Sequence, residues 1–217
     1  MDSKRLCEKC EKYSGEKLHD VSILKRLLKQ VCPSVDSNAC ARALMVKFVN
    51  LRNILTARES ELKEVCGISS SAAQLFVLLH QLYKRILIDK LKNTTACLEN
   101  GGYIEYLMLN FDHAGEEKLE IILFDVSGRV ITNKTNDGLS SQVVFDNNDI
   151  VSFALEYKAA YVIISHNHLH GKLSWSDADI KSTQNLAKAL DVVNVKLYDH
   201  ILVVGNKCLS YRNDSQV

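Results

Sequence analysis

The hydrophobic pattern changes its period near residue 95, and this change constrains the fold more than any other feature of the chain. Before it, apolar residues recur at helical spacing, as at Leu24, Leu28 and Val31. After it, short runs of the strand type such as "KLEIILF" and "AYVIIS" alternate with helical segments. A chain of 217 residues can form two small domains. We therefore predict a helical domain over 1–95 and a layered α/β (α+β) domain over 96–217.

The stretch "CGISSS" in the first half predicts a tight turn between two helices. The residues from Thr56 to Glu59 have the form of a capping box, so a short helix should run from there to about Cys66, and Gly67 should stop it. Ser69 to Ser71 should cap a long helix. This order resembles a helix-hairpin-helix module, in which backbone N–H groups of the turn close on a DNA phosphate. Ser69 stands where such modules usually have a second glycine, so a purely structural helical hairpin is an equal alternative.

The charge is distributed unevenly along the chain. Residues 1–92 have a formal net charge of +7, whereas residues 93–217 have −6. The first half could therefore bind DNA phosphates, although short amphipathic helices with lysine-rich solvated faces would give the same excess. No apolar run approaches the roughly 20 residues of a spanning helix, and the seven cysteines have no disulfide-framework spacing. We expect free thiols, a cytoplasmic location and no membrane association.

The second half predicts helices and strands in alternation. A helix over 103–111 precedes a β-hairpin with its turn at Asp125 to Gly128. "QVVF" indicates a further strand, and Asp146 should cap the next helix. The unbroken apolar run "AYVIIS" is typical of a buried strand, and it leads into a histidine-rich stretch. A helix over 176–190 and the runs "VKLYD" and "HILVVG" complete this half.

Four polar residues follow the buried strand at a spacing typical of a metal site: His166, His168, Ser176 and Asp179. The two histidines lie two residues apart, so an extended backbone directs both imidazoles to the same side. Asp179 falls in the first turn of the next helix, which can fold back over the strand end. Two nitrogens and one carboxylate oxygen around an open position are typical of catalytic zinc rather than structural zinc.

Each part of this pattern has an ordinary explanation. Ser176 and Asp179 alone could form a capping box, and histidines after a strand could lie on a surface loop. Neither explanation accounts for the joint spacing, so we favour a metal site formed by His166, His168 and Asp179.

The spacing His166-x-His168-x7-Ser176-x2-Asp179 matches the metal motif of the JAB/JAMM (MPN+) metallohydrolases. Together with "DHILVVG" downstream, it resembles the RadC-like branch of that superfamily (UPF0758-type, DNA repair protein RadC family). The resemblance implies a helix-hairpin-helix-like domain followed by a JAB/MPN domain of the cytidine-deaminase-like α/β fold. The glutamate that the family places eight residues before the hairpin aspartate corresponds to Glu117. For its neighbours Glu116 and Glu120 we expect solvated surface carboxylates.

The resemblance implies a hydrolytic mechanism for these residues. Zn²⁺ on His166, His168 and Asp179 would activate water, and Glu117 would act as the general base and acid. Ser176 would donate a hydrogen bond to the developing oxyanion. The expected substrate contains a peptide-like or isopeptide-like bond in an unknown protein or peptide. For Asp199 and His200, orientation of a metal ligand and a satisfied polar pair at a strand end are equal hypotheses.

The metal loop departs from the family pattern, because Leu169, His170, Leu173 and Trp175 occupy a stretch where the family has prolines. Two alternatives to a peptidase-like enzyme therefore remain at this point. One is a DNA-associated repair or recombination protein whose JAB domain is a nuclease or a non-catalytic scaffold. The other is a metal-binding pseudoenzyme.

Overall fold

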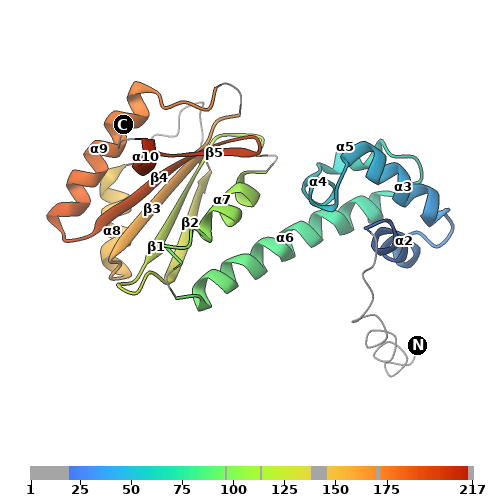
Figure 1. Cartoon of the computed structure of the whole chain (residues 1–217), viewed down its shortest axis with the longest axis horizontal. Helices are drawn as coiled ribbons and strands as arrows, with labels where there is room; N and C mark the ends of the chain where they lie inside the picture. Colours follow the sequence, from blue (N-terminus) through green and yellow to red (C-terminus); the bar gives the residue numbers. More distant parts are fainter. Residues whose placement is uncertain (1–19, 96, 113, 138–145, 170–171, 215–217) are drawn as a thin grey trace. The chain divides into compact units, whose positions relative to one another are not determined.

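The computed structural model describes residues 20–95, 97–112, 114–137, 146–169 and 172–214 (Figure 1). The chain divides into two compact units, 1–80 and 81–217, and the division falls inside the long helix α6 (Ser70–Asn93). The first unit is helical. The second contains a five-stranded sheet with helices on both faces, so the mixed α/β architecture expected from the change of period is confirmed.

Four helices precede α6 in the described part of the first unit. They are α2 (Asp20–Val31), α3 (Ser37–Phe48), α4 (Leu51–Thr56) and α5 (Glu59–Lys63). Each contributes apolar residues to one core, among them Leu24, Leu28, Leu44, Ile54 and Leu62, and α6 adds Phe76. The helices are short, so packing of these apolar faces rather than intrinsic propensity stabilises them.

The turn between α5 and α6 follows the expected order but not the expected capping box. Thr56 ends α4 and donates its hydroxyl hydrogen to the carbonyl of Arg52, at 3.0 Å. The helix α5 begins three residues later than predicted, and Glu61 accepts a hydrogen bond from the backbone N–H of Arg58 at 2.8 Å. Ser69 does cap α6, since its hydroxyl accepts from the N–H of Ala72 at 3.2 Å. The resemblance of this turn to a DNA-binding module stays a prediction.

The sheet of the second unit has the order β2-β1-β3-β4-β5. Its strands are β1 (Lys118–Phe124), β2 (Val130–Asp137), β3 (Tyr161–Asn167), β4 (Lys196–Val204) and β5 (Lys207–Ser210). Only β3 and β4 run parallel, and the other pairs are antiparallel. The helix α9 (Asp177–Val192) connects β3 to β4, which is the crossover that a parallel pair requires.

The two faces of the sheet carry separate apolar cores. On one face, Ile122, Phe124 and Ile163 pack with α7 (Tyr103–Phe111) and with the end of α6. On the other face, Leu119, Ile121 and Val162 pack with α8 (Asn147–Glu156) and α9. Figure 1 shows α7 on one side of the sheet and α8 with α9 on the other. Strand alternation thus assigns each residue of β1 and β3 to one face.

Most expected elements of this unit are present. The hairpin turn at Asp125 is closed by the Asp125 carboxylate, which accepts hydrogen bonds from Ser127 and Arg129. Asp146 caps α8 by accepting from the N–H of Asn148 at 2.8 Å. The predicted strand "QVVF" lies outside the described residues. None of the described helices combines the length and the apolar character that a membrane crossing requires.

Candidate metal centre

The end of β3 and the beginning of α9 bring His166, His168 and Asp179 together. Each offers one ligand atom, and these three atoms lie within 4.8 Å of one another. The backbone N–H of His168 donates to the carbonyl of Val203 at 3.0 Å, which continues the β3–β4 ladder past the end of β3. The extended backbone therefore places both imidazoles on the same side, as the spacing predicted.

Two of the three separations between these ligand atoms are close to those around a tetrahedral ion, and the third, from Nε2 of His168 to Oδ2 of Asp179, is longer at 3.9 Å. The Nε2 atoms of His166 and His168 lie 3.1 Å apart, and the Nε2 of His166 lies 3.4 Å from Oδ1 of Asp179. Zinc–nitrogen bonds of about 2.0–2.1 Å at a tetrahedral angle place two ligand atoms about 3.3 Å apart. The donor set of two imidazoles and one carboxylate could thus hold a metal ion with one position left for another ligand.

Ser176 and Asp179 form the capping box that was the ordinary explanation of their spacing. The Ser176 hydroxyl accepts from the Asp179 N–H at 3.1 Å and donates to Oδ2 of Asp179 at 2.6 Å. The cap engages Oδ2, which also lies 3.9 Å from Nε2 of His168, while Oδ1 lies 3.4 Å from Nε2 of His166. The same pair of residues therefore begins the helix and orients the carboxylate.

His200 and Thr183 form a chain of hydrogen bonds that ends at Nδ1 of His166. The Nδ1 atom of His166 lies 2.8 Å from Nε2 of His200, and the Nδ1 of His200 lies 2.6 Å from the Thr183 hydroxyl. Burial lowers the pKa of His166 to about 4, an effect that Asp179 opposes and His168 reinforces. Burial also lowers the pKa of His200 well below its ordinary value. Both imidazoles are consequently neutral at pH 7, and a neutral imidazole has the lone pair that a metal ligand needs.

Trp175 lies beside this pair of histidines. Its ring centroid is 4.8 Å from that of His200, 6.2 Å from that of His166 and 5.5 Å from that of Tyr211. In the described part of the chain no hydrogen-bond partner reaches its buried Nε1. The indole therefore acts here as an aromatic wall of the candidate centre, in a loop without prolines.

Glu117 immediately precedes β1, at the end of that strand that pairs with the His166 end of β3. Leu119 of β1 pairs with His166 of β3, and continuing this register places Glu117 opposite His168. Asn167 fixes the preceding segment, because its side chain accepts from the N–H of Lys118 at 2.7 Å and donates to the carbonyl of Glu116 at 3.2 Å. The alternation of β1, extended by one residue, would direct Glu117 toward the face that Leu119 and His166 occupy, so the role of Glu117 stays a prediction.

The expectation of a solvated carboxylate was wrong for Glu120. Its side chain is on the opposite face of β1 and is fully buried. It accepts hydrogen bonds from side chains of α7 and β2, namely Tyr106, Asn110, Asn133 and Thr135. Glu116 is exposed, as expected, with an ion pair of 3.6 Å to Lys118.

Asp199 and His200 have separate roles. The Asp199 carboxylate accepts from the N–H of His200, the hydroxyl of Ser210 and the N–H of Arg212, so it is a satisfied polar group that ties β4 to α10 (Tyr211–Asp214). Only His200 contacts a candidate ligand. Their adjacency in the sequence gave no sign of this division, because the partners of each come from different elements.

His170, the third histidine of the loop, lies outside the described residues.

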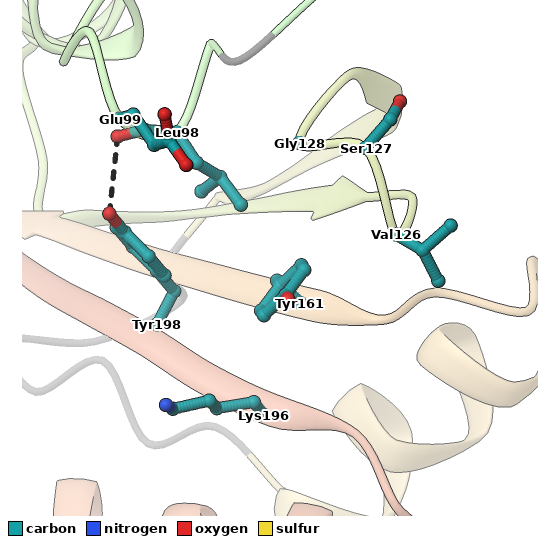
Figure 2. Close-up of a pocket in the computed structure, with 8 residues that line it drawn as sticks. All are labelled: Leu98, Glu99, Val126, Ser127, Gly128, Tyr161, Lys196 and Tyr198. Atoms are coloured by element: carbon teal, nitrogen blue, oxygen red, sulfur yellow. Dashed lines mark hydrogen bonds between the residues drawn. The ribbon is translucent and has the colours of Figure 1, made fainter.

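A separate pocket of about 220 Å³ lies at the other end of β3 (Figure 2). It is lined by Leu98, Glu99, Val126, Ser127, Gly128, Tyr161, Lys196 and Tyr198. Tyr161 is the first residue of β3, whereas His166 is its last but one. This pocket is therefore distinct from the candidate metal centre.

Comparisons with known proteins give matches that together cover most of the chain. A family model described as "RadC-like JAB domain" matches residues 99–216. A UPF0758 protein of Burkholderia thailandensis is 30% identical over 195 residues, which cover 89% of this chain and 74% of that protein. A UPF0758 protein of Neisseria meningitidis serogroup B is 28% identical over 220 residues, covering 97% of this chain and 94% of the relative.

Proposed function

Because the chain belongs to the family of RadC-like JAB domains, we propose that it is a zinc-dependent hydrolase of the JAMM type acting on a peptide-like or isopeptide-like bond. The observation that carries the proposal is the convergence of two imidazole nitrogens and one carboxylate within 4.8 Å, from β3 and α9. Zinc held by His166, His168 and Asp179 would supply Lewis acidity and make water acidic enough to lose a proton near neutral pH.

The remaining residues act on protons and on the substrate. Glu117 accepts the proton of the attacking water and passes it to the leaving nitrogen, which requires a carboxylate on the ligand face of β1. Ser176 donates a hydrogen bond to the substrate oxygen as negative charge develops there. Its hydrogen is directed to Asp179 in the structure, and rotation of the hydroxyl redirects it. Asn167 holds the Glu117 segment in place.

The test combines metal content with cleavage. The protein purified without added metal should contain close to one zinc per chain, and a His166→Ala/His168→Ala variant should contain none. Glu117→Gln should keep its zinc and lose about 100-fold or more of the cleavage of peptide and isopeptide-linked substrates. Glu116→Gln, one residue away and exposed, is the matched control and should retain cleavage. A chain that takes up no zinc even when supplied with it would refute the proposal.

We propose as a second candidate that the first unit binds DNA. The net charge of +4 over residues 1–80, from 13 Lys and Arg against 9 Asp and Glu, favours this, as does the first turn of α6, which contains no acidic residue. Affinity for a DNA duplex should fall steeply with salt in fluorescence anisotropy. A Lys25→Gln/Lys29→Gln variant should bind more weakly, whereas Lys181→Gln/Lys188→Gln on α9 should bind as the wild type does. Equal binding by both variants would argue against the first unit as the DNA site.

A further inference from the structure

Thr183 has a single hydroxyl hydrogen, and its direction is set by the structure. Its Oγ1 lies 2.6 Å from the carbonyl oxygen of Asp179 and 2.6 Å from Nδ1 of His200. A carbonyl oxygen has no hydrogen to contribute, so the hydrogen in the first contact comes from Thr183. Toward His200 the hydroxyl oxygen can therefore only accept, and Nδ1 of His200 must be the protonated nitrogen of that ring.

The same assignment of hydrogens applies to the contact between His200 and His166. A neutral imidazole has one ring hydrogen, and in His200 that hydrogen is used on Thr183. Its Nε2 is then an acceptor, so the 2.8 Å contact with His166 requires a hydrogen on Nδ1 of His166. The Nε2 of His166 is left with a free lone pair, and it is this nitrogen that lies 3.1 Å from Nε2 of His168 and 3.4 Å from Asp179.

The three groups are shielded from water. Thr183 is 2% exposed, His200 is 1% exposed and His166 is 5% exposed. Trp175 packs against the rings of His200 and His166, and Tyr211 packs against Trp175. Water cannot readily replace either hydrogen bond here, so breaking one leaves a buried polar group unsatisfied.

We propose that Thr183 and His200 are positioning residues that fix His166 in the Nδ1–H tautomer, with its Nε2 lone pair directed at the metal position. The inference deepens the proposed function and rests on it for its purpose. It assigns ligand orientation to His200 and extends the centre along α9, from Asp179 in the first turn to the Thr183 hydroxyl four residues later. Groups that orient a metal-binding histidine in this way change metal affinity by about 10- to 100-fold when removed.

The ring hydrogens can be observed directly. Long-range ¹H–¹⁵N NMR spectra of the histidine rings, recorded on the full chain after metal removal by chelation, should show both His166 and His200 protonated at Nδ1. A His166 ring protonated at Nε2 would overturn the proposal. In Thr183→Val, His200 should populate both tautomers. Ser165→Ala is the matched control, since it removes another buried hydroxyl, which donates to the carbonyl of Ile201.

Zinc affinity gives the second readout. Competition with a chromophoric chelator should show affinity about 10-fold or more lower in Thr183→Val and His200→Leu, and unchanged in Ser165→Ala. His200→Gln should recover much of the loss, because its amide oxygen can accept from Nδ1 of His166. Equal zinc affinities of the His200→Leu and His200→Gln variants would overturn the proposed positioning role of His200. Neither measurement depends on catalytic turnover. A chain that binds zinc but cleaves no substrate would refute the proposed hydrolase activity alone. An active chain with His166 protonated at Nε2 would refute the positioning role of Thr183 and His200 alone.

Discussion

Glu120 places an ionisable carboxyl group in the interior of the sheet domain, where glutamates are rarely found. Its four hydrogen bonds come from α7 and β2, so one side chain of β1 joins three elements. Burial raises the pKa of Glu120, and hydrogen bonds from Thr135, Asn133 and Tyr106 oppose part of that rise. The folded protein therefore binds a proton at Glu120 more readily than the unfolded chain does.

This shift predicts how stability depends on pH. The contribution of Glu120 is greatest below its ordinary pKa of 4.5, and it is lost as the pH rises through the higher pKa of the folded state. Glu120→Gln should lack this component, so the stability advantage of the wild type over the variant should shrink as the pH rises from 4.5. Urea unfolding at several pH values, followed by fluorescence of Trp175, the single tryptophan, measures the free energy of unfolding of both proteins. Exposed Glu99→Gln is the control, and an advantage that grows with pH would contradict the assignment.

The grouping of the three candidate ligands could be predicted from the sequence because their relation is local. His-x-His after a strand and an aspartate in the next helical turn need only the periods of strand and helix. The burial of Glu120 was missed because buried glutamates are rare, although its position between Leu119 and Ile121 in an apolar run was a usable signal. Thr183 and His200 could not be assigned, because their contacts with the ligands join a helix and two strands.

At the scale of elements, the segment before β1 depends on Asn167 for its position. The amide of Asn167 holds the backbone at Lys118 and Glu116, on either side of Glu117. Asn167→Ala should leave the three ligand atoms in place but release this segment. We expect retained zinc and cleavage reduced by about 10- to 100-fold, because small misplacements of a catalytic group are costly. Parallel zinc and cleavage assays test this, with exposed Asn148→Ala as control; loss of zinc would point to a different role.

The turn between α5 and α6 requires glycine at position 67. Gly67 has a φ of +85°, and a Cβ there would lie 2.4 Å from Sγ of Cys40 and 2.8 Å from a methyl carbon of Val35. Gly67→Ala should destabilise the first unit by about 2 kcal/mol or more, from backbone strain and the displaced neighbours. Circular dichroism during urea unfolding measures the change. Gly115→Ala, with open space around its Cβ, should be close to neutral, and equal effects would disprove the packing argument.

Helices and strands with strong periodicity were predicted well, and the errors concern their ends. The helix over 103–111 has the predicted bounds, whereas the capping box expected at Thr56 lies two residues further along, at Arg58 and Glu61. The local pattern is compatible with a helix that starts at either position. Packing of Ile54 and Leu62 into the core selects the later start. The end of a helix is decided by tertiary contacts that a capping pattern does not contain.

For the whole molecule, the boundary between the domains depends on where α6 is assigned. The sequence predicted a change at 95/96, the family model begins at 99, and the compact units divide at 80/81. Leu87, Ile88 and Leu91 belong to the core of the sheet domain, where they are 8%, 4% and 6% exposed. Hydrophobic period alone could not reveal this, because a helix that joins two domains has the same pattern in both. The predicted boundary therefore stays a hypothesis that fragments can test.

A fragment of residues 81–217 should fold as a unit, and a fragment of residues 96–217 should not. The shorter one lacks Leu87, Ile88 and Leu91, whose burial contributes on the order of 5 kcal/mol, a large share of the stability of a domain. Size-exclusion chromatography and urea unfolding followed by Trp175 fluorescence compare the two.

In the full chain, Leu87→Ala/Leu91→Ala should destabilise the sheet domain, whereas Leu78→Ala/Leu82→Ala, at positions 60% and 55% exposed on the same helix, should not. Equal unfolding midpoints for the two fragments would place the boundary after α6, because the sheet domain would then need no part of that helix for its core.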